Sequence, residues 1–419
     1  MDARRNSADR RRSWTPHAAH RTMLARSVDP LVETLMSLFS PLQFDVAVIG
    51  AGPAGSAAAL AAARCGKNSG ASGGARVLLV DRAQFPRAKV CGSCLTDEGI
   101  ATIHSIGATR VLASATPLRS VRVTCGAREL RISRPAGVAI ARELLDTALF
   151  EEAQSAGVDV RLATSARVRP DRTLELACGD QRFEVRASTV IVADGLAGNA
   201  LDEIDGFTWR IAKRSHMGFG AILPAGSVQC APGEICMRVV DGGYIGAVQL
   251  ASGEVDVAAA IDPKLLRAAK NVALCARDML GEAVLDAPAL ERARWRGTPL
   301  LTRRRARVAA EGILVVGDAA GYVEPFTGEG MTWALSTGAA AGTLAATHAA
   351  PHQVWPRRYA ALTRAPRLRC ALLSRTLRAP RLVRAMLAVG ERFPLPFASF
   401  ARSLGRTSHA CDHRSASTA

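Results

Sequence analysis

The chain has 419 residues, of which 48% are hydrophobic, and a formal net charge of +17. This length suits two interleaved domains with tails. No uninterrupted apolar run reaches the roughly 18 residues that a membrane span requires. The arginine-rich start lacks the apolar segment of a secretory signal, so we expect a cytoplasmic protein with reduced thiols.

The positive charge is concentrated at the two ends of the chain. Residues 1–26 contain seven arginines against two aspartates, and residues 357–406 contain twelve arginines against one glutamate. The rest of the chain is therefore nearly neutral, which argues against a nucleic-acid groove built into the fold. We expect residues 1–43 to form a disordered basic extension and residues 407–419 to be disordered as well.

The first predicted element is a strand that runs into a glycine-rich turn. Phe44 to Ile49 are mostly apolar, as in a strand buried on both faces of a parallel sheet, and an alanine-rich helix follows the turn. Gly50 permits the tight exit from the strand, Gly52 lets a pyrophosphate approach, and Gly55 allows close helix packing. The turn predicts a dinucleotide site, formed by Gly50, Gly52, Pro53, Ala54 and Gly55.

A second strand carries the acid that such a site requires. It ends in Asp81 and Arg82, where the Asp81 carboxylate can accept hydrogen bonds from ribose hydroxyls. The usual spacing from the glycines is about 20 residues, and here the distance from Gly50 is longer. We interpret the Gly/Ser stretch 67–74 as an inserted surface loop. These features leave NAD and FAD open.

A second glycine-rich signature decides between the two cofactors. An apolar strand ends in Gly317 and Asp318, and a loop leads to a helix beginning near Gly330. Asp318 can accept a hydrogen bond from a ribityl hydroxyl. The N–H groups of Gly330 and Met331 can face the pyrimidine edge of a flavin, where the helix dipole favours the negative charge of the reduced ring. Both signatures together favour FAD.

The sequence resembles a known flavoprotein superfamily. "GAGPAG", "FPRAKVCG", "VADG" and "VVGDAAGYVEPFTGEGM" occur in the order seen in the aromatic-hydroxylase superfamily, and "FPR-x-K-x-CG" with "P-x-TGEG" resembles its geranylgeranyl reductase branch. The resemblance implies FAD and an electron donor such as NAD(P)H. The further cofactor-binding candidates that it implies are Arg87, Cys91, Arg142, Asp194 and Gly328.

Several of these residues have a plain structural alternative. Arg142 could be a surface arginine capping its helix, Arg87 and Lys89 could be solvated loop charges, and Asp194 could simply form a turn. After Asp194 the hydroxylases commonly carry "x-x-S-x-V/L-R", which this chain lacks. The departure weakens the expectation that NADPH docks there as it does in hydroxylases.

The segments between the flavin motifs predict antiparallel strands. Residues 121–134 and 172–187 are each typical of a hairpin, and residues 216–261 contain further alternating strands. We expect these strands to form a sheet over the flavin, with the substrate between sheet and ring. Tyr244 could face this pocket or belong to the core. The reductase branch has "G-Y-x-W-x-F-P", whereas this chain lacks the Trp and Pro, and no halogenase-type "W-x-W-x-I-P" is present.

The predicted fold is α/β: a Rossmann-like FAD-binding domain, an interleaved antiparallel-sheet substrate domain and a C-terminal helical tail. The domain boundaries that we expect are 44–115, 136–200 and 308–350 for FAD, 116–135 and 201–307 for the substrate, and 351–406 for the tail. The tail alternates apolar residues with arginines at helical spacing. Such a helix could contact an anionic membrane surface or pack on the body with a solvated face.

Three functions remain open at this stage. The favoured one is reduction of a C=C bond in a hydrophobic isoprenoid or polyketide-like molecule, because of the branch resemblance. The second is hydroxylation of an aromatic or polyketide substrate through a flavin hydroperoxide. The third is dithiol chemistry at Cys91 and Cys94, which would need a second nucleotide motif that the chain lacks. The flavin itself carries the chemistry, with Tyr244 and Cys91 as weak catalytic candidates and no metal.

Overall fold

The computed structural model describes residues 42–68, 74–133, 137–324 and 328–393. These residues all belong to one compact unit that begins at Leu42. Nearly all of the expected basic extension, residues 69–73 of the expected inserted loop and residues 394–419 lie outside the described residues.

The centre of the first sheet is built from parallel strands whose side chains are mostly apolar and buried where the strands pair. β1 (Leu42–Ile49) pairs with β2 (Val77–Val80) on one side and with β11 (Gln181–Val192) on the other. β8 (Asp159–Arg161) and β20 (Ile313–Val315) extend the sheet outward in parallel. Since the strand order reverses beside β1, a crevice opens at the carboxyl ends of these strands, which is where α/β proteins bind ligands.

A hairpin predicted for the substrate sheet belongs to this first sheet instead. β10 (Leu174–Cys178) pairs in antiparallel fashion with β11 and also with β9 (Ser165–Val168). The reason is the length of β11, which has 12 residues. Its first half completes the hairpin and its second half pairs with β1. The small strand β19 (Ala309–Ala310) ends the sheet beyond β20.

Two helices cross at very short distance on this sheet. α2 (Pro53–Asn68) follows the glycine turn, and α9 (Gly330–Thr347) begins where the sequence predicts a helix. A Cβ at Gly338 or Gly342 of α9 would lie 2.0 Å from a carbonyl oxygen of α2. Only glycine permits this approach. α4 (Arg142–Ser155) also packs against α2.

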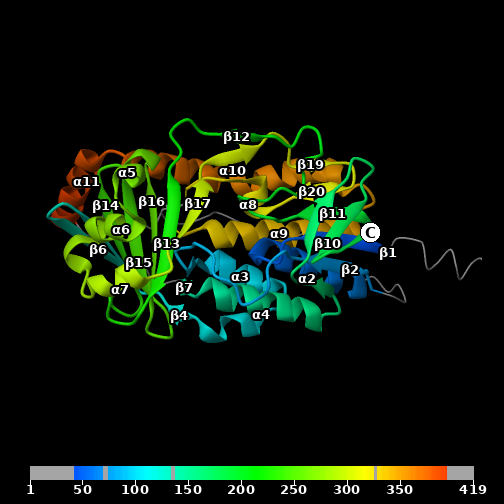
Figure 1. Ribbon diagram of the computed structural model, residues 1–419, viewed down its shortest axis with the longest axis horizontal. Coiled ribbons are helices and arrows are strands. Elements are labelled where there is room, and N and C mark those ends of the chain that lie inside the picture. The colour runs from blue at the N-terminus through cyan, green and yellow to red at the C-terminus, as the bar shows by residue number, and fades with distance from the viewer. Residues whose placement is uncertain (1–41, 69–73, 134–136, 325–327, 394–419) are drawn as a thin grey trace, which may run out of the picture. The chain divides into compact units, whose positions relative to one another are not determined.

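The second sheet is predominantly antiparallel, and helices pack against both of its faces (Figure 1). Its strands, in spatial order, are β17 (Arg296–Leu300), β13 (Met217–Leu223), β16 (Val255–Ile261), β15 (Gly243–Gln249), β14 (Glu234–Val240), β5 (Ser120–Cys125) and β6 (Arg128–Ser133). Only the β14–β5 pair is parallel. The expected hairpin at Gly126 is confirmed as β5–β6. The helices α5 (Pro263–Ala268), α6 (Val272–Leu280) and α7 (Ala287–Arg292) follow β16.

The smaller elements connect these two sheets. They are β3 (Cys94–Leu95), β7 (Val138–Ala139), β4 (Thr116–Pro117), β12 (Trp209–Ile211), β18 (Arg303–Arg305), β21 (Gly321–Tyr322), α3 (Asp97–Ser105), α8 (Gly317–Ala320) and the 3₁₀ turns η1 (Thr109–Ser114) and η2 (Gly281–Ala283). β3, β7 and β4 form one three-stranded sheet, and β12, β18 and β21 form another.

Two helices end the described chain. α10 (Pro351–Leu377) is fixed to the first sheet by the fully buried Trp355, whose Nε1 donates to the Val315 carbonyl over 3.0 Å. α11 (Pro380–Arg392) packs against β5, β6 and β14 of the second sheet. The predicted helical C-terminal segment is thus confirmed. None of the helices in the described ranges is long and apolar enough to cross a membrane.

Candidate active site

A cavity of about 1100 Å³ lies between the two sheets. The glycine turn, α8 and the start of α9 line one side, and strands of the second sheet line the other. α10 and α11 contribute a further wall. Of the sixteen predicted cofactor-binding residues, all but Gly55 and Gly317 line this cavity, and so does Tyr244.

Glycine is required at each of the three positions of the turn for a different structural reason. Gly50 has a φ of +104°, and a Cβ there would lie 2.5 Å from the Ala193 carbonyl oxygen. A Cβ at Gly55 would lie 1.6 Å from the Gly50 oxygen, so this residue serves packing rather than the cavity wall. Gly52 faces the cavity, and its nearest neighbours are the guanidinium groups of Arg87 and Arg142. The turn therefore presents bare backbone opposite two cations.

Asp81 holds the glycine turn to the next strand. Its carboxylate accepts hydrogen bonds from the backbone N–H of Ala51 over 2.8 Å and of Ala83 over 2.9 Å. The side chain is buried, although it lines the cavity. A carboxylate has about four lone-pair sites, so Asp81 keeps acceptor capacity for a ligand. Arg82, next in sequence, is exposed at the cavity rim.

Arg142 is buried at the start of α4, so it is not a surface capping residue. Its guanidinium makes two 2.8 Å hydrogen bonds to Asp146, one turn later in the helix. Burial opposes the charge of Arg142, but the Asp146 carboxylate outweighs it and raises the pKa of Arg142. Arg87 lies 3.5 Å from the same carboxylate, and its buried Nε has no hydrogen-bond partner among the described residues.

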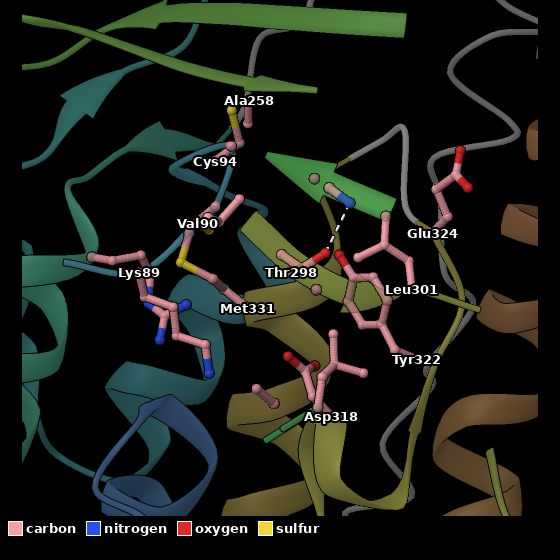
Figure 2. A pocket seen from close by; sticks show the side chains of 18 of the residues that line it. Lys89, Val90, Cys94, Ala258, Thr298, Leu301, Asp318, Tyr322, Glu324 and Met331 are labelled. Carbon is pink, nitrogen blue, oxygen red and sulfur yellow. Dashed lines mark hydrogen bonds between the residues drawn. The ribbon is translucent and has the colours of Figure 1, made fainter. Parts of the chain in front are cut away.

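Lys89 and Asp318 are two charged residues that line the cavity (Figure 2). Burial lowers the pKa of Lys89, and Arg142 lowers it further, whereas Asp318 opposes the shift. Burial likewise raises the pKa of Asp318, opposed by Lys89 and Arg142. Each group therefore moderates the desolvation of the other. Asp318 lies on α8, directly after β20, as the sequence predicts.

Gly328 and the first residues of α9 line the cavity. Gly328 has a φ of +74°, and a Cβ there would lie 2.9 Å from the Cys94 Cβ. Gly330 is the first residue of α9, and Met331 follows with its side chain buried. Gly317 also has a left-handed φ of +55° but packs against α2 instead of lining the cavity.

Asp194 acts at least as a turn former. Its Oδ2 accepts a hydrogen bond from the Ala200 N–H over 3.0 Å, six residues later. Its buried Oδ1 has no hydrogen-bond partner within the described part of the chain. Burial raises the pKa of this carboxyl. The side chain thus has one oxygen engaged in the turn and one without a partner.

The two cysteines of the loop are buried to different degrees. Both line the cavity, but Cys91 is half-buried beside Arg142, whereas Cys94 is buried in β3. Burial raises the pKa of the Cys91 thiol. Because the thiolate is the nucleophile in dithiol exchange, this environment does not favour dithiol chemistry.

The opposite wall contains polar groups that the motifs did not reveal. Asp256 is the second residue of β16 and is buried, yet it lines the cavity. Burial raises the pKa of Asp256 to about 7, opposed by a hydrogen bond with Ser93 and by Arg142. Tyr322 and Glu324 also face the cavity (Figure 2). A carboxyl between two valines in an apolar strand was the available sequence signal for Asp256.

Tyr244 is buried in the core and also lines the cavity. It is buried in β15, and burial raises its pKa well above the usual value for tyrosine. It hydrogen-bonds Glu324, whose carboxylate also lies 3.0 Å from the His216 Nδ1. Tyr244 is therefore one member of a buried polar cluster, a setting that the sequence does not reveal.

Comparison with known proteins identifies the family. Residues 44–253, half of the chain, match the family described as pyridine nucleotide-disulphide oxidoreductase. A menaquinone reductase of Mycobacterium tuberculosis is 32% identical over 330 residues, which cover 72% of this chain and 76% of the relative. The chain belongs to this family of FAD-dependent oxidoreductases.

Further relatives of the flavoprotein agree with the predicted branch. Digeranylgeranylglycerophospholipid reductase 2 of Methanopyrus kandleri is 29% identical over 330 residues, covering 73% of this chain and 77% of the relative. A geranylgeranyl bacteriochlorophyll reductase-like structure from Thermoplasma acidophilum has a TM-score of 0.67 at 17% identity, covering 87% of this chain and all of that chain.

A flavin-dependent brominase has a TM-score of 0.71 at 16% identity, covering 87% of this chain and 93% of that chain. At these identities the two structures show the shared fold alone. They confirm the predicted fold class.

Proposed function

We propose that this flavoprotein reduces a carbon–carbon double bond in a polyisoprenoid chain. The observation that carries the proposal is the continuity of the cavity, in which the glycine turn and Asp318 share one space with an apolar wall. That wall includes Val121, Val123, Leu130, Ile132, Ile235, Met237, Leu301 and Leu377. The curated relatives support the substrate class, because menaquinone and digeranylgeranylglycerophospholipids both carry polyisoprenoid chains.

The residues of the wall around the glycine turn fit FAD. Gly52, Pro53 and Ala54 would bind the diphosphate at the start of α2, where free N–H groups favour anions, and Arg87 and Arg142 lie beside them. The unpartnered Arg87 Nε is a donor that such an anion would satisfy. Asp81 and Arg82 would contact the adenosine side, with Cys91, Asp194 and Gly328 lining the remainder.

Asp318 and the start of α9 would hold the flavin end. Asp318 would accept a ribityl hydroxyl, and the N–H groups of Gly330 and Met331 would face the ring. Gly50, Gly55 and Gly317 would act by shaping the turns. When bound and reduced, FAD supplies the hydride for one carbon of the double bond. NAD(P)H or another reductant would supply the electrons to FAD.

The second carbon requires a proton, and Asp256 is placed to hold one. Its pKa of about 7, raised by burial, keeps much of the carboxyl protonated at neutral pH. Transfer of that proton leaves a carboxylate that Arg142 stabilises, since Arg142 lowers the pKa of Asp256. Ser93 holds the carboxyl by a hydrogen bond. The apolar wall around it excludes water that would otherwise exchange the proton.

An anaerobic experiment tests the reaction. The protein-bound FAD is reduced without oxygen, and geranylgeraniol is added while the flavin absorbance is recorded. We expect flavin reoxidation with a product that has gained two hydrogen atoms. Substrate-dependent oxygen uptake with a hydroxylated product, and no anaerobic reoxidation, would instead establish the monooxygenase alternative.

The hydrophobic small molecule is one predicted partner, and an anionic membrane is the other. Contact between the basic helical tail and such a membrane is also a proposal. Exposed apolar side chains and arginines of α10 and α11 support this proposal.

A further inference from the structure

Exposed apolar side chains are concentrated in the two C-terminal helices. Eleven large apolar side chains are exposed in the described part of the chain, and six of them lie between residues 351 and 393. This segment is a small fraction of the described residues. Scattered exposed apolar residues need no explanation, whereas a concentration on one segment marks an interaction surface.

On α11 these side chains form one stripe. Leu382, Val389 and Phe393 are 50%, 55% and 57% exposed. Leu382 and Val389 are seven residues apart, which places them within about 20° of each other on a helix that turns about 100° per residue. Phe393 directly follows the end of the helix at Arg392. α10 presents a similar row, since Leu368 and Leu372 are 61% and 55% exposed and lie four residues apart.

The same helices form a wall of the cavity. Leu373, Leu377, Val383, Met386 and Leu387 line it from the other side of α10 and α11. Met386 lies only about 40° around α11 from Leu382. The apolar surface of α11 therefore continues from the exposed stripe, past Met386, to the cavity. Most amphipathic helices of soluble proteins have one apolar face toward the core, but α11 exposes part of its apolar surface.

The charge beside the stripe is positive. Residues 351–393 contain ten arginines and a single acidic residue, Glu391. That glutamate pairs with Arg128 on β6 over 2.5 Å, which fixes the end of α11 to the sheet. Arg381 and Arg392 lie together on α11, about 80° to 100° from the stripe. Arginines that flank an apolar stripe suit a surface of anionic headgroups above acyl chains.

We propose that α11 and the second half of α10 dock on anionic lipid bilayers, and that the substrate passes from the bilayer to the cavity along the apolar side of α11. The route rests on the proposed polyisoprenoid substrate, whereas the docking does not. An anionic bilayer explains both features of the surface. A nucleic-acid backbone would match the arginines but would leave the apolar stripe in water.

Co-sedimentation with vesicles tests the docking. We expect the full-length protein to sediment with phosphatidylglycerol vesicles and to remain in solution with phosphatidylcholine vesicles. Raising the salt concentration should weaken the interaction, because surface charges are screened beyond roughly 8 Å at physiological ionic strength. Equal sedimentation with both lipids, or with neither, would overturn the proposal, as would binding to duplex DNA without binding to vesicles.

Matched variants assign the interaction to α11. Val389→Glu should weaken vesicle binding at least tenfold, because it places a carboxylate within the stripe. Arg381→Gln with Arg392→Gln should weaken vesicle binding about 25-fold, at about fivefold for each arginine near an anionic surface. The control is Leu285→Glu, at a leucine that is 63% exposed outside the helices, and it should bind as the parent does. Equal losses in the control and in Val389→Glu would overturn the assignment.

A transfer experiment tests the route separately. Radiolabelled geranylgeraniol is supplied either in phosphatidylglycerol vesicles or in detergent micelles. For Val389→Glu we expect uptake from vesicles to fall at least tenfold, while uptake from micelles stays within twofold of the parent protein. Equal uptake from vesicles in both proteins would overturn the route. If the parent protein takes up no probe from either source, the proposed substrate is wrong, while vesicle binding still decides the docking.

Discussion

The two walls of the cavity are built on different principles. The wall around the glycine turn depends on backbone positions that tolerate one residue type and on a few paired charges, such as Arg142 with Asp146. The wall on the second sheet consists mainly of apolar side chains, with Asp256 and Tyr244 as buried polar exceptions. A single substitution should therefore disable the first wall, whereas most substitutions on the second should only reshape it.

The strongest test of this contrast compares two glycines. Gly55→Ala should destabilise the protein by about 3 kcal/mol and abolish FAD binding, because its Cβ would lie 1.6 Å from the Gly50 oxygen. The matched variant on the second sheet is Gly297→Ala, where the nearest atom would be 3.9 Å away. Thermal unfolding and flavin absorbance measure both. Similar losses in the two variants would refute the contrast.

Loss of a charge on the cofactor wall should come next. Asp318→Ala removes the carboxylate that moderates the pKa shift of the half-buried Lys89, and with it the acceptor proposed for the ribityl chain. We expect most of the FAD to be lost on gel filtration, whereas Asp180→Ala, in an exposed hairpin turn, should retain it. Full flavin occupancy in the first variant would show that Asp318 is not a ribityl contact.

On the substrate wall, the one residue expected to matter individually is Asp256. Asp256→Asn should retain FAD but lower the rate of product formation by about 100-fold or more, the usual contribution of a positioned proton donor. The variant should also lose the decline of rate with pH near 7, where Asp256 titrates. Asp241→Asn, at an exposed turn of the same sheet, is the control. An unchanged pH–rate profile in Asp256→Asn would rule out the proton-donor role.

The same carboxyl predicts a smaller effect on stability. Because the folded pKa of about 7 exceeds the usual unfolded value of about 3.9, the folded state holds the proton more tightly. The stability of the parent relative to Asp256→Asn should therefore fall as pH rises from 4 to 7, by at most about 1.4 kcal/mol per pH unit. Burial also raises the pKa of Glu98 to about 7. Because Glu98 is present in both proteins, its contribution cancels from the difference in stability. Urea unfolding at several pH values measures the difference, and a constant difference would contradict the shift.

The sequence predicted the cofactor wall well because that wall uses residue types with few alternatives. Gly50 adopts a left-handed φ, and Asp318 follows a buried strand. The left-handed turn and the strand end each leave a recognisable pattern of residue types in the local sequence. The start of α9 at Gly330 was predicted for the same reason. The assignment of these residues to FAD contacts stays a prediction.

The substrate wall was harder to predict because tertiary packing decides it. An alternating strand does not reveal which sheet it joins, so the hairpin of β10 and β11 was placed in the wrong sheet. Asp256 carries no motif, and its importance arises only from its burial beside Ser93 and Arg142. The inward side of α11 was likewise not identified, because a helix with apolar residues on both sides has no single predicted partner.

The close crossing of α2 and α9 fixes the distance between the N-termini of these two helices. The N-termini of both helices line the cavity, and Gly338 and Gly342 lock the two helix axes together. Side-chain adjustment therefore cannot change the spacing between the two ends of the cofactor site. A flavin without its adenosine half, such as FMN, would reach only one of these helix ends. On the proposed placement of FAD, we therefore expect the protein to bind FAD in preference to FMN.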